Sequence, residues 1–130
     1  MIAQFFDRQD TANPMNGTML DNSDELRKML SELRSRQPFF AELIGENGYK
    51  LLLGIGFSDS CVQHSSADGS APYLMAVAVE AREGEVEFLI ADTASPVPMR
   101  YCLSYETMVE IATHFLNSGE RYPTVDWEEL

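Results

Sequence analysis

The last third of the chain, Glu85–Leu130, reads EVEFLIADTASPVPMRYCLSYETMVEIATHFLNSGERYPTVDWEEL and carries the clearest structural signals in the sequence. Val86, Phe88 and Ile90 recur at every second position, as the buried side chains of a half-buried strand do. Asp92–Pro98 is typical of a turn, because its two prolines cannot donate to a strand ladder. The stretch therefore predicts a strand followed by a turn.

A capped helix follows the second strand of this stretch, which we expect over Met99–Leu103. Ser104 stands where a helix N-cap is needed, and Gly119 can end the helix in a left-handed conformation. Between them lies an apolar stripe at helical spacing, formed by Met108, Ile111, Ala112 and Phe115. A final short strand is expected over Thr124–Trp127.

The preceding part of the chain adds one helix and several strands. An apolar stripe of Leu26, Met29, Leu30 and Leu33 predicts the helix, with Asn22 or the competing Ser23 as its N-cap. Short apolar or alternating runs predict strands over Met1–Asp7, Phe39–Ile44, Tyr49–Phe57, Cys61–Ser65 and Tyr73–Glu80. Tyr73–Glu80 is the most apolar of these and is expected at the centre of the sheet. Arg82–Gly84 is expected to be the hairpin turn into Val86.

This order of elements predicts an α+β fold, because connections of a few residues cannot make parallel crossovers. We expect a mainly antiparallel sheet of about six strands, with two amphipathic helices packed on one face. No repeat or linker divides the sequence, so residues 1–130 are expected to form a single domain. The other face would then be a floor of small residues with a charged rim, made by Gly54, Gly56, Ala76, Ala78, Glu80, Glu85, Glu87 and Arg100. This face is a candidate docking surface, unless its two glycines serve only a bulge or a strong twist.

The charge of the chain is strongly negative and unevenly distributed. The formal net charge is −12. Residues 1–36 hold six acids and five bases, a net charge of −1, whereas residues 37–130 hold fifteen acids and four bases, a net charge of −11. Such a surface repels nucleic acid and membrane phosphates and attracts a basic protein partner. The alternative is that the acids only keep the protein soluble.

The sequence contains neither a run long enough to span a bilayer nor a signal peptide, so we expect a cytoplasmic protein. In that compartment Cys61 and Cys102 are expected to be free thiols rather than a disulfide. Neither they nor His64 and His114 have the spacing of a metal site, and we predict no metal and no cofactor.

Catalytic signals are equally weak. Gly54-Ile55-Gly56 is a fragment of a phosphate-binding loop without the following glycine and helix start. Glu85 and Glu87 share a strand face and resemble a pair of general acids, but that spacing is more typical of a solvated face. We therefore predict no catalytic residue.

Several segments together resemble a known family. They are the central segment Asp68-Gly69-Ser70-Ala71-Pro72-Tyr73, the strand Glu85-Val86-Glu87-Phe88, the pair Val97-Pro98, the helix end Phe115-Leu116-Asn117-Ser118-Gly119-Glu120 and the stretch Tyr122-Pro123-Thr124-Val125-Asp126-Trp127-Glu128. Over roughly residues 49–128 the chain looks like a bacterial immunity-protein family. That family accompanies polymorphic toxins, often of the nucleic-acid deaminase type.

The resemblance implies an immunity protein that binds its cognate toxin and occludes the toxin's nucleic-acid cleft. The carboxylates would take the place of phosphates, so the expected partner is a basic, nucleic-acid-acting toxin domain rather than nucleic acid or a membrane. The candidate partner-binding residues are Asp59, Asp68, Tyr73, Glu80, Glu85, Glu87 and Asp92. The alternatives are immunity to a nuclease toxin, an acidic adaptor domain, or an enzyme with an unrecognised carboxylate site.

Overall fold

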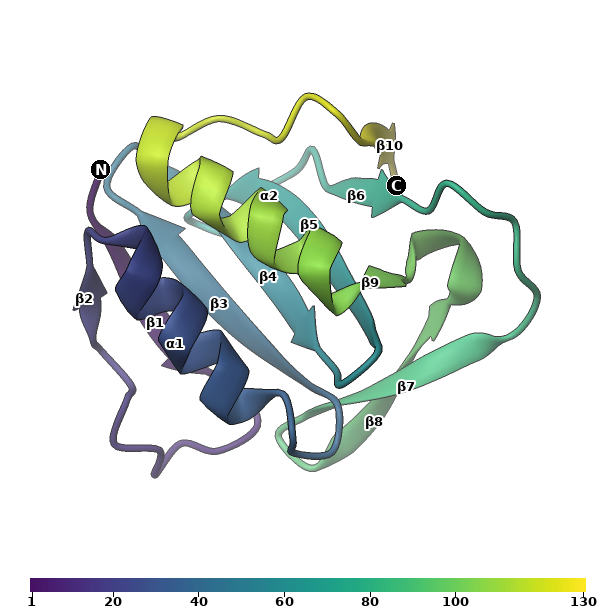
Figure 1. The fold of residues 1–130 in the computed structure, drawn as a ribbon, viewed down its shortest axis with the longest axis horizontal. Coiled ribbons are helices and arrows are strands. Elements are labelled where there is room, and N and C mark those ends of the chain that lie inside the picture. Colours follow the sequence, from purple (N-terminus) through teal and green to yellow (C-terminus); the bar gives the residue numbers. More distant parts are fainter.

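A computed structural model describes residues 1–130 as a curved sheet with two helices lying across one of its faces (Figure 1). The helices are α1 (Ser23–Leu33) and α2 (Tyr105–Ser118), and a single 3-10 turn, η1, covers Met99–Tyr101. The strands are β1 (Ala3–Asp7), β2 (Met19–Leu20), β3 (Phe39–Gly45), β4 (Tyr49–Ile55), β5 (Asp59–Ser66), β6 (Leu74–Val77), β7 (Glu85–Ile90), β8 (Thr93–Pro98), β9 (Leu103–Ser104) and β10 (Asp126–Glu129).

The main path through the sheet is β10-β6-β5-β4-β3-β1-β2, and all of its neighbouring pairs are antiparallel. Strand β7 joins β3 through one parallel pair, and β8 pairs with β7 alone. The predicted α+β class is confirmed: the sheet is mainly antiparallel and carries two helices on one face. It has ten strands rather than about six, because several short edge strands add to the long central ones.

Both helices begin at the residues that the sequence favoured. The Asn22 side chain accepts hydrogen bonds from the backbone N–H groups of Asp24 and Glu25, so Asn22 and not Ser23 caps α1. Ser104 Oγ accepts from the N–H of Thr107 at 3.1 Å and caps α2. Helix α2 ends at Gly119, whose φ of 76° is left-handed.

The main core lies between the helices and the sheet. The predicted stripe of α2 is fully buried there, because Met108, Ile111, Ala112 and Phe115 each have no exposed surface. The stripe of α1 is buried as well, and both pack with the inward side chains of β1, β3, β4 and β5 in one apolar cluster. This packing confirms the predicted placement of the helices.

The segment Asp92–Pro98, predicted as a turn, is instead mostly strand β8, so that prediction is wrong. Prolines 96 and 98 are tolerated because β8 has a partner on one side only and needs no N–H group on the other. The turn itself is the pair Ala91 and Asp92, with φ values of 47° and 64°. Positive φ at both central residues is the geometry of a tight two-residue hairpin.

Three other boundaries also differ from the expectations. Tyr73–Glu80 is not a central strand, because β6 covers only Leu74–Val77 and lies between β5 and β10, near the edge of the sheet. Arg82–Gly84 is not a hairpin turn, because β6 and β7 are not paired with each other. Met99–Leu103 forms η1 before β9, and the last strand begins two residues later than Thr124.

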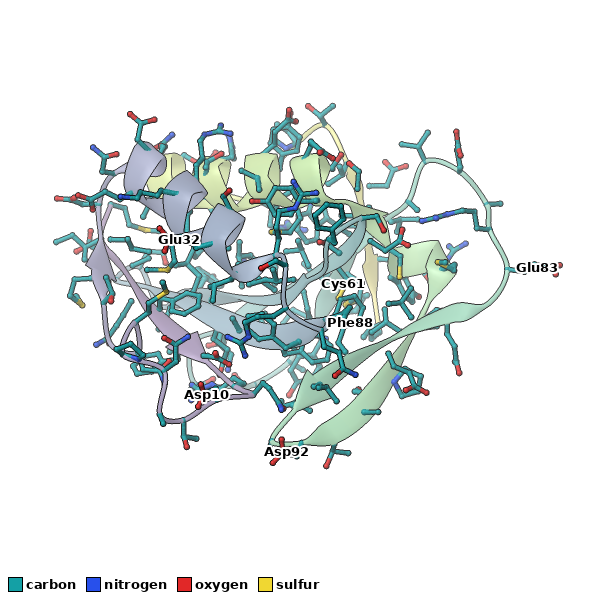
Figure 2. The ribbon with its side chains drawn as sticks, turned by 60° about the horizontal axis from the view of Figure 1, so that its bottom comes forward. Asp10, Glu32, Cys61, Glu83, Phe88 and Asp92 are labelled. Carbon is teal, nitrogen blue, oxygen red and sulfur yellow. The ribbon has the colours of Figure 1, made fainter.

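The face opposite the helices is partly closed by the β7–β8 hairpin, which Figure 2 shows below the sheet. Phe88 of this hairpin is fully buried in a second apolar cluster with Phe40, Cys61, Met75, Val97 and Cys102. A Cβ atom at Gly54 would lie 2.4 Å from the Sγ of Cys61 and 2.9 Å from a ring carbon of Phe88. Gly54 is therefore glycine because the hairpin approaches the sheet closely at this point.

The expected floor of small residues on an open face is consequently wrong. Gly54 and Gly56 are both buried. Ala76 is also fully buried, but in the cluster under the helices. At Gly56 a Cβ would lie 2.1 Å from the carbonyl oxygen of Asp59, so this glycine serves the tight connection between β4 and β5.

Removal of the buried Phe115 ring of α2 should destabilise the protein strongly. We expect Phe115→Ala to lower the free energy of unfolding by about 3–5 kcal/mol, because a fully buried ring would leave a cavity. Glu106→Ala, at an exposed position of the same helix, should stay within about 0.5 kcal/mol of the parent. Denaturant unfolding measures both, and equal midpoints for the parent and the Phe115 variant would contradict the packing of α2.

The close approach of the hairpin gives a second stability test. We expect Gly54→Ala to destabilise the protein by about 1–3 kcal/mol, because the added methyl group has no space beside Cys61 and Phe88. The same substitution in a Cys61→Ala background should cost less, because the nearest obstructing atom is gone. Thermal melts of the four proteins test this, and equal costs in both backgrounds would show that the steric explanation is wrong.

Candidate functional site

The acids that the sequence selected lie mainly on the connection between β6 and β7 and on the hairpin. Glu80, Glu85 and Glu87 are exposed and form no ion pair, and the same is true of Glu83, which the sequence analysis did not select. Figure 2 shows Glu83 at the tip of the connection, pointing away from the molecule. We call these four residues the acidic edge.

Asp59 lies near the acidic edge but is not a free acid. It begins β5, and Arg82 donates to its Oδ1 at 3.0 Å and to the carbonyl oxygen of Cys102 at 3.2 Å. Asp59, Glu80 and Arg82 line a groove of about 490 Å³ together with Cys102 and Thr107. The ion pair therefore ties the connection to the start of β5 and neutralises one of the predicted contact residues.

The remaining predicted residues are dispersed. Asp68 is exposed in the loop after β5 and accepts from the hydroxyl and the N–H of Ser70, and these bonds lower its pKa. Tyr73 is half-buried, and its hydroxyl donates to the carbonyl oxygen of Gly69. Asp92 stands in the hairpin turn, bonded to Gln9, at the opposite end of the hairpin from Glu83 (Figure 2). The structure thus brings Asp59 together with Glu80 in one groove and places Glu85 and Glu87 side by side on β7, but it disperses Asp68, Tyr73 and Asp92.

The part of the sheet that stays open carries a compensated charge rather than an acidic rim. Glu42 of β3 is 7% exposed and is held between Arg8 and Lys50. Burial raises the pKa of the Glu42 carboxyl, but hydrogen bonds from Lys50 and Arg8 outweigh burial, and the net pKa lies below the ordinary value. Two cations around one acid make this patch slightly positive, so it is not the docking face that the sequence suggested.

A larger groove lies elsewhere, at the end of α2, and the sequence analysis did not identify it. Its volume is about 950 Å³. It is lined by residues 47–49, 64–66, 70–72, 74, 119–123, 125 and 127. Two of these segments belong to those that carry the family resemblance, the loop before β6 and the stretch after Gly119. We call this feature the His64 groove.

His64 forms the floor of this groove among aromatic rings. Its ring stacks on Tyr49 with centroids 5.1 Å apart and meets the edges of Phe115 and Trp127 at 6.2 and 6.3 Å. The residue is only 8% exposed. Arg121 lies 6.0 Å from the Trp127 ring centre and forms no ion pair. Three aromatic side chains from β4, α2 and β10 thus surround the imidazole.

The His64 imidazole is neutral and unpaired. Neither ring nitrogen has a hydrogen-bond partner in the protein, and both stay accessible from the groove. Burial lowers the pKa of His64, and the nearby positive charge of Arg121 lowers it further. A neutral imidazole offers one donor and one acceptor, so the groove presents both functions to a ligand.

The cysteines and the other titratable groups do not assemble a reactive centre. Cys61 and Cys102 are free and buried in the second apolar cluster. Burial raises the pKa of both thiols, that of Cys102 to about 11. Cys61 and His64 are an odd number of positions apart on β5 and so point to opposite faces. No three His, Cys, Asp or Glu side chains gather where they could hold a metal ion.

Comparisons with known proteins leave the family open. No protein-family model matches this chain, and no curated protein matches it either. The resemblance to an immunity family therefore rests on the segments quoted above. Neither helix of the structure is long and apolar enough to cross a membrane.

Protonation of His64 should weaken the fold. Its folded-state pKa lies below the ordinary value of 6.5, so the unfolded chain binds the proton more tightly. The stability that neutral His64 contributes is fully present above pH 6.5 and is lost as the pH falls through the lower, folded-state pKa. We therefore expect the denaturation midpoint to fall more between pH 7.5 and pH 5 in the parent than in His64→Gln.

The difference between the parent and His64→Gln isolates the contribution of His64 to the pH dependence of stability. The low pKa values of Asp7 and Glu42 affect stability in both proteins and at lower pH, so they cancel in the difference. Chemical denaturation at a series of pH values provides the measurement. Parallel pH profiles for the two proteins would show that His64 is not held neutral by its surroundings.

Proposed function

We propose that this chain is an immunity protein that binds a cognate polymorphic toxin of the nucleic-acid deaminase type and occludes its active-site cleft. A nuclease toxin is the alternative, because its cleft also binds phosphates and carries the same positive charge. The protein would act in the cytoplasm, by binding and without chemistry of its own. The observation that carries the proposal is the unpaired state of the acidic edge.

Unpaired carboxylates on a projecting element are suited to a basic partner. The net charge of −12 already attracts cations at long range. Within it, Glu80, Glu83, Glu85 and Glu87 have no cation to release when a partner's lysine or arginine arrives. Charge pairing at this edge therefore competes with water alone, not with an existing ion pair.

The geometry of β7 also favours a partner that binds a nucleic-acid strand. Glu85 and Glu87 are two residues apart on one strand, so both point to the same side, about 6.7 Å apart along it. Opposite them on β8 are Pro98 and Pro96, which leave that surface without further charge. A short row of like negative charges on a stiff support resembles a stretch of phosphate backbone.

Occlusion requires no pocket at the two β7 acids. Glu85 and Glu87 lie on an open strand and line neither of the two grooves described above. A general acid needs a defined position close to the proton that it transfers, and an exposed strand face does not supply one. This supports inhibition by binding over the carboxylate-enzyme alternative.

The proposal predicts rapid, salt-sensitive association. The product of the adjacent reading frame is co-expressed with this chain and recovered by pull-down, and the kinetics of their association are then measured at rising salt. We expect Glu80→Gln, Glu85→Gln and Glu87→Gln together to slow association by about tenfold or more at low salt, with a flatter salt dependence.

The control removes the same charge from the helical side of the molecule, with Glu25→Gln, Glu32→Gln and Glu106→Gln, all at exposed positions. This variant should associate nearly as fast as the parent, because its carboxylates do not face the cleft. Absence of any complex would refute the immunity function. Equal slowing by the two triple variants would show that net charge, and not the acidic edge, attracts the toxin.

A further inference from the structure

The His64 groove is not used by the acid-based mechanism, and its lining includes an imidazole that forms no hydrogen bond within the protein. The His64 side chain as a whole is only 8% exposed, and its ring nitrogens are open to the groove rather than buried. A ligand in the groove can therefore reach a polar group that no protein atom occupies. We propose that the His64 groove binds an uncharged, extended peptide segment of the protein's partner, with a peptide amide bonded to the imidazole.

Hydrogen-bond complementarity selects the peptide amide. A neutral imidazole has one N–H donor and one acceptor nitrogen, and each peptide unit likewise carries one acceptor and one donor. A carboxylate offers acceptors only, and an ammonium group offers donors only, so either would leave one imidazole nitrogen unsatisfied. Leaving a desolvated polar atom without a partner is costly, which gives the groove a preference for amides.

The charge of the groove supports an uncharged ligand. The floor is neutral at His64, and Glu120 and Arg121 on the rim have opposite charges. Because Arg121 forms no ion pair, its guanidinium can donate to a second carbonyl of the same segment. Pro72, Leu74 and Val125 supply apolar surface between these polar points.

Size and composition also fit a peptide. A volume of about 950 Å³ is at the upper end for ligand sites and suits a chain of several residues. Tyr49 and Trp127 border the imidazole, and Tyr, Trp and Arg are the residue types that dominate binding energy at protein interfaces. If the partner is the proposed toxin, the acidic edge would govern association and the groove would govern dissociation.

The test does not require the toxin. A phage-displayed library of random linear peptides is selected against the parent protein, and the affinities of the enriched peptides are measured for purified variants. We expect uncharged peptides whose affinity falls about tenfold in His64→Leu and in Arg121→Leu, because a leucine side chain can neither donate to the ligand nor accept from it. Arg27→Leu, the same substitution at an exposed position on α1, should bind them as the parent does.

A structural readout accompanies the affinities. On addition of an enriched peptide, the imidazole resonances of His64 should shift, whereas those of His114 should move little because that side chain does not line the groove. Circular dichroism establishes that each variant is folded, and should His64→Leu not fold, Arg121→Leu carries the affinity comparison alone.

Failure of this inference is distinguishable from failure of the immunity function. A selection that yields no binder, or binders that both variants hold as tightly as the parent, would overturn the peptide site whatever the toxin does. Absence of a toxin complex would overturn the immunity function and leave a confirmed peptide site in place. Enrichment of strongly charged peptides would contradict the argument from neutral charge and overturn the proposal as stated.

Discussion

The contact between Phe88 and Gly54 fixes the position of the β7–β8 hairpin against the rest of the sheet. The hairpin β7–β8 is joined to the rest of the sheet through one parallel pair with β3, so backbone hydrogen bonds alone do not hold it firmly. Its position depends on the burial of the Phe88 ring in the second apolar cluster. Only a glycine leaves room for that ring. Because the inner face of the hairpin is thereby used for packing, Glu85 and Glu87 on its outer face are directed to solvent.

Local signals predicted α2 well, and tertiary pairing limited the prediction of the strands. Ser104 and Gly119 act within one turn of the helix ends, and the buried stripe follows from spacing alone, so no distant residue had to be known. Pro96 was misleading, because a proline is compatible with a strand only when that strand has a free edge. Whether β8 has a neighbour is a property of the whole sheet, and the sequence around Pro96 contains no information about it.

The residues of the candidate sites likewise divide into those that local signals predict and those that only tertiary contacts bring together. The exposure of Glu85 follows from alternation along one strand and was predicted, but the ion pair of Asp59 with Arg82 joins positions 23 residues apart and was not. The His64 groove was missed because its parts come from segments that are distant in the sequence. A single signal was available: His64 falls two residues after Val62, on the strand face that is buried. A polar residue at a core position indicates either a satisfied hydrogen bond or a binding site.

The separation of the two surfaces matters for the proposed function, because they act over different distances. Unpaired carboxylates act over about 10 Å at ordinary ionic strength and can orient a basic partner before contact. They contribute little once salt or water competes with an exposed pair. A neutral imidazole does the opposite: it exerts no force at a distance, but a hydrogen bond to the largely buried His64 side chain joins uncharged groups and is therefore insensitive to salt. An acidic protein that carried only the acidic edge would attract many basic proteins and discriminate poorly among them. The His64 groove adds specificity that charge cannot supply, because a partner must also present an uncharged peptide segment that can form hydrogen bonds with His64.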